Sequence, residues 1–376
     1  MSKFIKQAVK DIEISGIRTF NALANHVDGV IKLTIGELDV NTPEIVKIAA
    51  IKAISNNQTR YTENKGILEL RKKIAEKYKH YASDEVILTV GTTEGLGIVL
   101  KSIIDEGDEV IIPTPGYVGY LPLITLEKGI VKTINTIKDD HKITKESLLK
   151  AYSKHTKALI ITNPNNPTGN VLSLPEMELI KDFVLEKDIV LISDEIYSSI
   201  VFEKEFYSFS KYPELKTNLV ILNGFSKSHA MTGFRIGYVV SNIEMINHFV
   251  KVHQYNVTST STISQYAALE AIDVQYDSMV KSLSHKRNLV LQSLDELGFP
   301  YIPSNGAFYV FFDISKYKLS SYDYCVKLLN EFKVALIPGE YFLGNHKEFV
   351  RLSYAVSEDK LIKALELLKA FDQANS

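Results

Sequence analysis

Residues 158–194 have the sequence ALIITNPNNPTGNVLSLPEMELIKDFVLEKDIVLISD. The apolar, β-branched runs at 158–162 and 189–193 predict two buried strands, and Pro175 with the acidic residues after it indicates the start of a helix between them. A strand, a helix and a second strand in this order are typical of a βαβ unit with parallel strands. Because both runs are almost continuously apolar, we expect helices to cover both faces of the sheet.

The same alternation extends on both sides of this unit. Apolar runs at residues 86–90, 109–113 and 219–223 predict further strands, and helical patterns such as the one at 67–79 separate them. The sequence therefore predicts an α/β protein whose large domain, residues 31–279, holds a doubly wound, mostly parallel sheet. Domains of this kind place their chemistry at the carboxyl ends of the strands.

The C-terminal part of the chain shows a different pattern. Strand-like apolar segments at 305–314 and 349–356 precede a closing helical pattern at 358–373. We expect residues 1–30 and 280–376 to form together a smaller α+β domain that packs against the large one.

Charge and cysteine content exclude several classes of protein. The 376 residues include 43 Lys plus Arg and 45 Asp plus Glu, and the net charge of −2 provides no electrostatic footprint for nucleic acid or an anionic membrane. No apolar run reaches about 18 residues, and the N-terminus lacks the apolar stretch of a signal peptide. The lone Cys325 can form no internal disulfide, and no zinc-type spacing is present. We therefore expect a cytoplasmic enzyme without a metal and without nucleic-acid or membrane partners.

The segment NGFSKSHAMTGFRIGY, residues 223–238, directly follows a predicted strand and contains a lysine and an arginine eight residues apart. The amine of Lys227 could form a Schiff base with an aldehyde cofactor, and Arg235, in a glycine-flanked turn, could bind the phosphate of that cofactor. Taken singly, lysines and arginines are more often solvated surface charges than cofactor ligands.

Three other motifs follow predicted strands. Asp194 could keep a pyridine nitrogen protonated, or it could cap a helix. Asn166, in the rigid loop NPNNPTG, could donate to a ring hydroxyl or serve only the turn. Gly91, Thr92 and Thr93 lie between a strand and a helix, where backbone N–H groups could bind a phosphate.

In combination, NPNNPTG, SDEIY and SKSHAMTGFRIGY resemble the motifs of the class I/II aminotransferases, which are pyridoxal phosphate (PLP) enzymes of fold type I. The motifs follow one another in the family's order along nearly the whole chain. The resemblance implies fold type I, PLP as the cofactor, and transfer of an amino group from an amino acid to a 2-oxo acid by a ping-pong mechanism.

The resemblance also implies a role for each matching residue. The implied catalytic residues are Lys227 as the Schiff-base lysine and proton carrier, Asp194 as the partner of the pyridine nitrogen, and Tyr197. The residues implied to bind the cofactor are Gly91, Thr92, Thr93, Tyr117, Asn166, Asp194, Tyr197, Ser226, Lys227, Arg235 and Tyr61. The residues implied to bind the substrate are Gly36, Asn166 and Arg351, the last at the α-carboxylate.

Two of these positions carry further implications. Tyr61, in RYTENKG, matches a tyrosine that reaches the phosphate of the neighbouring subunit, so the resemblance implies a homodimer with shared active sites. Gly224 stands where many members of the family have a serine on the phosphate. Ser226 or Ser228 could replace that contact, or either serine could cap a helix.

The substrate is less strongly indicated. Specific aspartate aminotransferases often bind the distal carboxylate through a second arginine, for which Arg18 and Arg60 are candidates, although both could be surface residues. The segments EISGIRTF (13–20) and KVHQYNVTSTSTISQYAALEA (251–271) resemble the N-acetyl-L,L-diaminopimelate aminotransferases of lysine biosynthesis, which would pair that amino acid with 2-oxoglutarate. Aromatic or aspartate aminotransferase activity, a PLP-dependent C–S β-lyase and a non-catalytic PLP-binding regulator stay open as alternatives.

Overall fold

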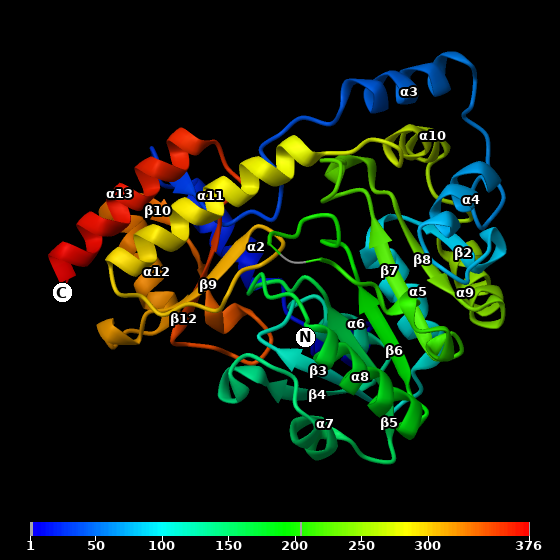
Figure 1. The fold of residues 1–376 in the computed structure, drawn as a ribbon, viewed down its shortest axis with the longest axis horizontal. Helices are drawn as coiled ribbons and strands as arrows, with labels where there is room; N and C mark the ends of the chain where they lie inside the picture. The colour runs from blue at the N-terminus through cyan, green and yellow to red at the C-terminus, as the bar shows by residue number, and fades with distance from the viewer. Residues whose placement is uncertain (1–2, 204, 376) are drawn as a thin grey trace.

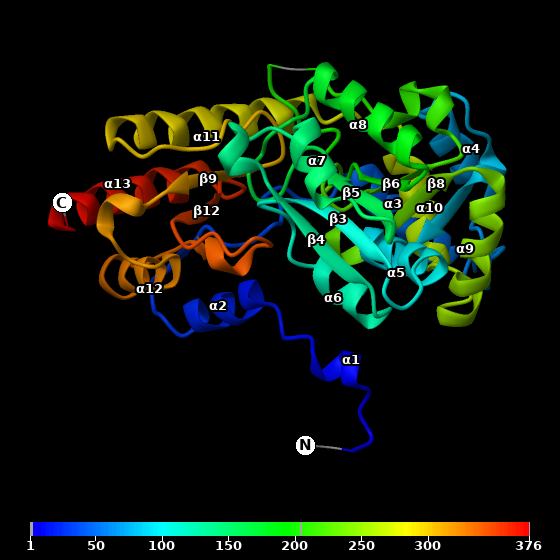
Figure 2. The same ribbon diagram turned by 90° about the horizontal axis from the view of Figure 1, so that it is seen from below.

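The computed structural model describes residues 3–203 and 205–375. Residues 1–2, 204 and 376, which fall within the predicted domains, lie outside the described residues. Figure 1 shows a large sheet in one half of the molecule and a smaller group of strands and helices in the other, and Figure 2 shows the same two regions from below.

Seven strands form the large sheet: β2 (Val86–Thr89), β3 (Glu109–Thr114), β4 (Ile130–Asn135), β5 (Thr156–Thr162), β6 (Val190–Asp194), β7 (Leu219–Gly224) and β8 (Gly237–Ser241). Their order is β2-β8-β7-β6-β5-β3-β4. Neighbouring strands from β4 to β7 are parallel, whereas β8 is antiparallel to both β7 and β2. The predicted α/β class with a mostly parallel sheet is confirmed.

Two strands of this sheet have no counterpart in the sequence prediction. β4 is an edge strand with one buried residue, so it lacks the continuous apolar run that marks the central strands. β8 is fully buried, but its sequence GYVVS is short and directly follows the motif around Arg235, so it was not recognised as a separate strand.

The helices of the chain are α1 (Gln7–Lys10), α2 (Gly16–Asn25), α3 (Glu44–Ser55), α4 (Leu68–Glu76), α5 (Gly91–Ile103), α6 (Tyr120–Leu126), α7 (Lys145–Ala151), α8 (Leu174–Lys187), α9 (Ile243–Asn256), α10 (Thr262–Ala271), α11 (Asp277–Glu296), α12 (Ser321–Phe332) and α13 (Glu358–Asn375). α8 begins at Leu174, so Pro175 and Glu176 lie in its first turn, as the sequence predicted. Ser173 accepts a hydrogen bond from the Glu176 N–H at 3.4 Å, and Glu176 accepts one from the Ser173 N–H at 2.9 Å.

Alternate side chains of the sheet enter two separate cores. Leu159 and Ile161 of β5 pack on one face with residues of α4 and α8. Ala158 and Ile160 of the same strand pack on the other face with residues of α5, α6 and α9. Because both faces are covered, the central strands are apolar at nearly every position, as the doubly wound prediction requires.

A further core lies at the C-terminal end of the chain. β9 (Tyr309–Asp313), β11 (Ile337–Pro338) and β12 (Phe349–Ser353) form an antiparallel sheet in the order β11-β12-β9. This core also contains Phe20 of α2 and apolar residues of α11, α12 and α13. β1 (Ile31–Lys32) pairs with β10 (Val334–Ala335), so the chain still lies beside this region just after residue 30. The domain division at residues 31 and 279 stays a prediction.

None of the helices in the described part of the chain has both the length and the apolar character that a membrane crossing requires.

Shortening a core side chain of β5 should destabilise the fold. Leu159 is completely buried, so Leu159→Ala should lower the free energy of unfolding by about 2–5 kcal/mol, through lost apolar burial and a residual cavity. Leu149→Ala makes the same change on α7 at a side chain that is 43% exposed, and should cost well under about 1 kcal/mol. Denaturant titration measures both, and equal costs at the two positions would contradict the assigned core.

Candidate active site

A cavity of about 490 Å³ opens beside the carboxyl ends of β5, β6 and β7. Residues of the N-terminal segment between Ser15 and Glu37 form part of its wall, as do Tyr309 and Arg351 from the C-terminal region. The predicted site residues that line it are Gly36, Thr92, Thr93, Tyr117, Asn166, Asp194, Tyr197, Ser226, Lys227, Arg235 and Arg351. The structure therefore brings together nearly all of the residues that the motifs predicted, and only Gly91 and Tyr61 are not part of the lining.

Lys227 lies in the turn after β7, and its Nζ donates a hydrogen bond to the carbonyl oxygen of Gly36 at 2.5 Å. Burial lowers the pKa of this amine to about 8; the negative charge of Glu37 opposes the shift, and the positive charges of Arg235 and Arg351 add to it. A fraction of the amine is therefore uncharged near neutral pH, as a nucleophile or a general base requires.

Asp194 ends β6 and is 8% exposed. One carboxylate oxygen accepts a hydrogen bond from the Tyr120 hydroxyl at 2.8 Å, and the other accepts one from the Ile196 N–H at 3.2 Å. Burial raises the pKa of Asp194 to about 6, although both hydrogen bonds oppose the shift. No cationic side chain among the described residues forms an ion pair with this carboxylate, so the site favours a positively charged ligand group.

Arg351 of β12 is a buried cation without a carboxylate partner in the described chain. Its Nη1 donates to Asn166 Oδ1 at 2.9 Å and its Nη2 donates to the carbonyl oxygen of Thr34 at 2.6 Å. Its Nε is buried and has no hydrogen-bond partner. The guanidinium carbon lies 4.4 Å from the centre of the Tyr309 ring. A carboxylate is the ligand that would satisfy this donor and this charge.

The start of α5 and Arg235 form the anion-binding end of the cavity. α5 begins at Gly91, whose φ is +71°, and Thr92 and Thr93 follow in its first turn. A Cβ on Gly91 would lie 2.7 Å from Arg235 Nη2, so glycine lets the guanidinium approach the helix start. Free N–H groups at a helix N-terminus and an arginine beside them are a strong combination for binding a phosphate.

Ser226 and Ser228, either of which could replace the phosphate contact that Gly224 cannot make, differ in position. Ser226 lines the cavity, whereas Ser228 donates to the Gly224 carbonyl oxygen at 3.2 Å and contacts His229 Nδ1 at 2.6 Å. Ser226 is therefore the one available to a ligand.

Aromatic side chains form the remaining walls. The Tyr197 and Tyr309 hydroxyls lie 2.9 Å apart, and the Tyr117 ring packs edge-on against Tyr120 with ring centres 5.4 Å apart. A flat ring placed in the cavity would therefore meet Tyr117 and Tyr197, together with the amide of Asn166.

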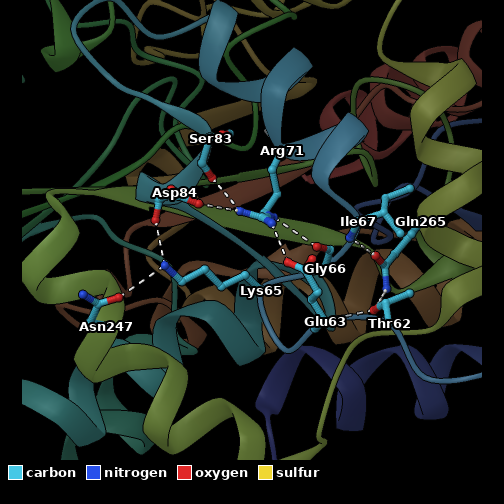
Figure 3. A network of polar contacts seen from close by, with 10 residues as sticks. All are labelled: Thr62, Glu63, Lys65, Gly66, Ile67, Arg71, Ser83, Asp84, Asn247 and Gln265. Carbon is cyan, nitrogen blue, oxygen red and sulfur yellow. Dashed lines mark hydrogen bonds and ion pairs between the residues drawn. The ribbon is translucent and has the colours of Figure 1, made fainter.

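Tyr61 is the predicted site residue that the structure does not bring to the others: it is 83% exposed and lies outside the cavity lining. A network of hydrogen bonds and ion pairs connects the loop after Tyr61 to the rest of the protein, as Figure 3 shows. The buried Arg71 donates to the Gly66 carbonyl oxygen at 3.0 Å and to Glu63 at 2.7 Å, while Gln265 donates to Thr62 at 3.0 Å. The tyrosine is thus presented outward on an ordered loop.

Several lining residues were missed by the sequence motifs. Tyr120, which donates to Asp194, stands in the same PTPGYVGY segment as Tyr117, so closeness to a predicted site residue is a signal that could have pointed to it. Asn21 and Glu37 reach the cavity only through tertiary packing. Of the two candidate arginines for a distal carboxylate, Arg18 lies in the cavity lining and Arg60 does not.

The family model described as "Aminotransferase class I and II" matches residues 28–368. The chain belongs to this family. It is therefore an enzyme that transfers amino groups, and PLP is the cofactor that the family uses. The resemblance to this family that the sequence motifs indicated is confirmed.

The aminotransferase is similar to proteins with different named substrates. It is 38% identical to a probable N-acetyl-LL-diaminopimelate aminotransferase of Bacillus subtilis (strain 168), over 99% of this chain and 96% of the relative. The crystal structure of an aspartate aminotransferase from Thermotoga maritima matches with a TM-score of 0.94 and 35% identity, covering 99% and 100% of the two chains. An aromatic aminotransferase from Pyrococcus horikoshii OT3 matches with a TM-score of 0.89 and 34% identity, covering 96% and 99%. Fold type I is thereby confirmed.

Glu195, next to Asp194 in this aminotransferase, is buried and is not part of the cavity lining. One of its oxygens accepts hydrogen bonds from Ser193 at 3.0 Å and Ser208 at 2.8 Å, and the other has no partner. Burial raises its pKa to about 8, against these hydrogen bonds. The folded protein therefore retains a proton on Glu195 at pH values where the unfolded chain, with an ordinary value of 4.5, has lost it.

This proton makes stability depend on pH. Between about pH 4.5 and 8 the folded state binds more protons than the unfolded state, so the contribution of Glu195 to stability falls as pH rises. Glu195→Gln removes this dependence, and its free energy of unfolding relative to wild type should rise by roughly 1–4 kcal/mol from about pH 5 to about pH 8.5. Denaturant titrations across this range measure the difference. The exposed Glu146→Gln is the control, and parallel pH profiles for wild type and Glu195→Gln would contradict the prediction.

Proposed function

We propose that this aminotransferase binds PLP in the 490 Å³ cavity and moves an amino group between an amino acid and a 2-oxo acid by a ping-pong mechanism. One observation carries the proposal: Lys227, Asp194, Arg235 and Arg351 converge on a single cavity, and the two buried charges among them, Asp194 and Arg351, have no counter-ion among the described residues. Unpaired buried charges are costly, so their convergence favours a ligand that supplies the missing partners.

The residues present fit PLP at each of its polar groups. The start of α5, Ser226 and Arg235 suit a phosphate, and the buried carboxylate of Asp194 suits a protonated ring nitrogen. The Asn166 amide and the Tyr197 hydroxyl suit the ring hydroxyl, and Tyr117 suits the ring face. Lys227, with a pKa of about 8, suits the aldehyde.

PLP supplies an aldehyde that bonds to amines and a ring that accepts electrons from the Cα of the bound amino acid. The Arg351 guanidinium would bind the α-carboxylate of the substrate and so fix the direction of the Cα–H bond. With PLP bound, the Lys227 amine would take the proton from the substrate Cα and carry it to C4′ of the cofactor, as general base and then general acid. Asp194 keeps a proton on the ring nitrogen throughout.

For the substrates we propose N-acetyl-L,L-diaminopimelate as amino donor and 2-oxoglutarate as acceptor, which would give the enzyme a role in lysine biosynthesis. The support is the 38% identity to the Bacillus subtilis relative over 99% of this chain. Aspartate and aromatic amino acids are the alternative donors, favoured by the Thermotoga and Pyrococcus structures.

Absorbance spectra with and without amino donors test the reaction. Wild-type protein reconstituted with PLP should show a visible band of lysine-bound cofactor, which glutamate should replace with a pyridoxamine band. Lys227→Ala should lose the band and at least about 10⁴-fold in turnover, because the nucleophile and the general base are lost together. The exposed Lys157→Ala should behave as wild type.

Full activity of Lys227→Ala would contradict the assignment of this lysine, and absence of any cofactor band in wild type would contradict PLP binding. Pyruvate and ammonia released from cystathionine, without an amino-transfer half-reaction, would instead support the C–S β-lyase alternative.

We also propose that the enzyme is a homodimer with shared active sites. The support is an apolar surface on α3, where Ile45, Ile48, Ile51 and Ile54 are all between 41% and 62% exposed. Isoleucines three residues apart are neighbours on a helix, so the four side chains form a continuous apolar strip across the exposed half of α3, opposite the buried Val46, Ala50 and Ala53. Such an exposed apolar surface is typical of an interface. The outward position of Tyr61 after this helix suits a contact with the cavity of a second copy.

Charged residues on this face should break the dimer. Wild type should sediment at twice the 42.3 kDa chain mass, whereas Ile48→Asp with Ile51→Asp should sediment as a monomer and bind PLP more weakly, because a buried interface would have to take up two charges. Ile130→Asp, at a 49% exposed position on edge strand β4, is the control. A dimer that survives the α3 variant would place the interface elsewhere.

A further inference from the structure

A buried histidine of α9 contacts the helix that forms the anion-binding end of the cavity. α9 lies beside α5 in both Figure 1 and Figure 2. The buried residues of α9 are Ile246, Phe249 and His253, and their spacings of three and four residues place them on one helix face. Ile246 and Phe249 pack into the core that also contains residues of α5. His253 is therefore a polar side chain on an otherwise apolar face, and it needs a polar partner.

The partner of His253 is Glu94, in the first turn of α5. His253 is completely buried, and its Nδ1 lies 3.0 Å from Glu94 Oε1. A carboxylate accepts hydrogen bonds, so the histidine Nδ1 is the donor in this contact. The Nε2 atom of His253 is buried and has no partner among the described residues. The contact with Glu94 is thus the one hydrogen bond that the described part of the chain offers to this ring.

Glu94 also holds the backbone at the start of α5. Its other carboxylate oxygen accepts a hydrogen bond at 3.1 Å from the N–H of Val90, the residue directly before the helix. Thr92 and Thr93 line the cavity, whereas Glu94 in the same turn is not part of the lining. The carboxylate is therefore held outside the cavity, between Val90 and His253.

A carboxylate in the first turn of α5 would compete with a phosphate if it were free to move. The N–H groups of a first helical turn have no partner within the helix, and the side chain of an acidic residue in that turn is attracted to them. A phosphate at the same helix end needs these N–H groups and is repelled by a nearby negative charge. The hydrogen bond from His253 counters both effects, because it engages one oxygen of Glu94 and keeps the carboxylate on the side of α9.

We propose that His253 is a positioning residue for the phosphate site: it holds the Glu94 carboxylate against Val90 and away from the N–H groups of α5 that receive the cofactor phosphate. This inference rests on the proposed binding of PLP in the cavity. It also gives a role to one residue of the segment 251–271, for which the sequence alone indicated a resemblance and no function.

Affinities for two forms of the cofactor test this role. The full-length protein, freed of cofactor, is titrated with PLP and with pyridoxal, which lacks the phosphate, and the absorbance of the lysine-bound form reports binding. His253→Leu should weaken PLP binding about 10- to 100-fold, as expected for the loss of a hydrogen bond to a charged group, and pyridoxal binding less than about threefold. His253→Asn keeps an N–H donor near the Nδ1 position and should retain most of the PLP affinity. His248→Leu makes the same change at an exposed position of α9 and should match wild type.

A second substitution separates this positioning role from simple packing. Glu94→Gln removes the charge that would compete with the phosphate, so adding it to His253→Leu should restore the PLP affinity to within about threefold of wild type. If His253 only filled space between α5 and α9, removing the charge of Glu94 would leave the loss in place.

Unchanged PLP affinity of His253→Leu, equal losses for PLP and pyridoxal, or no rescue by Glu94→Gln would overturn the role of His253. Failure of the proposed function has a different signature, because the wild-type protein would then show no band of lysine-bound cofactor with PLP.

Discussion

The Arg351 guanidinium connects three segments that are far apart in the sequence. It lies on β12, donates to Asn166 in the loop after β5 and to the backbone of Thr34 in the N-terminal segment, and stacks over Tyr309 of β9. Two of its nitrogens donate across these boundaries, so this one residue ties the C-terminal sheet to the loop after β5 and to the N-terminal segment. The cavity lies where these three parts meet, and the Arg351 Nε is a buried donor without a partner in the described chain.

The large sheet provides the rigid half of the site. Parallel strands have their carboxyl ends at one edge, so Asp194 after β6 and Lys227 after β7 are neighbours although 33 positions separate them in the sequence. Both faces of the sheet are packed with helices, which holds these strand ends in place. Groups of opposite chemistry, a buried carboxylate and an amine of lowered pKa, are thus kept in one cavity without pairing with each other.

Burying these ionisable groups costs stability, and the cost is visible in their pKa values. Asp194 and Glu195 are both raised in pKa by burial, and the pKa of Lys227 is lowered by burial. Groups shifted in this way favour their uncharged forms until a ligand brings a compensating charge.

The sequence by itself determined the α/β class, the five apolar strands, the family and most of the site. Buried parallel strands need continuous apolar runs, and residues such as Lys227, Asp194 and Arg235 lie in short local motifs, so both are visible in one dimension. It did not determine β4 or β8. β4 is an edge strand with little apolar character, and the short β8 directly follows the Arg235 motif and does not stand out from it. Only the tertiary structure decided that Tyr120 binds Asp194, that Thr34 binds Arg351, and that Arg18 lies in the cavity while Arg60 does not. These contacts join residues whose separation along the chain carries no periodicity, so they follow from packing between elements and not from any local pattern.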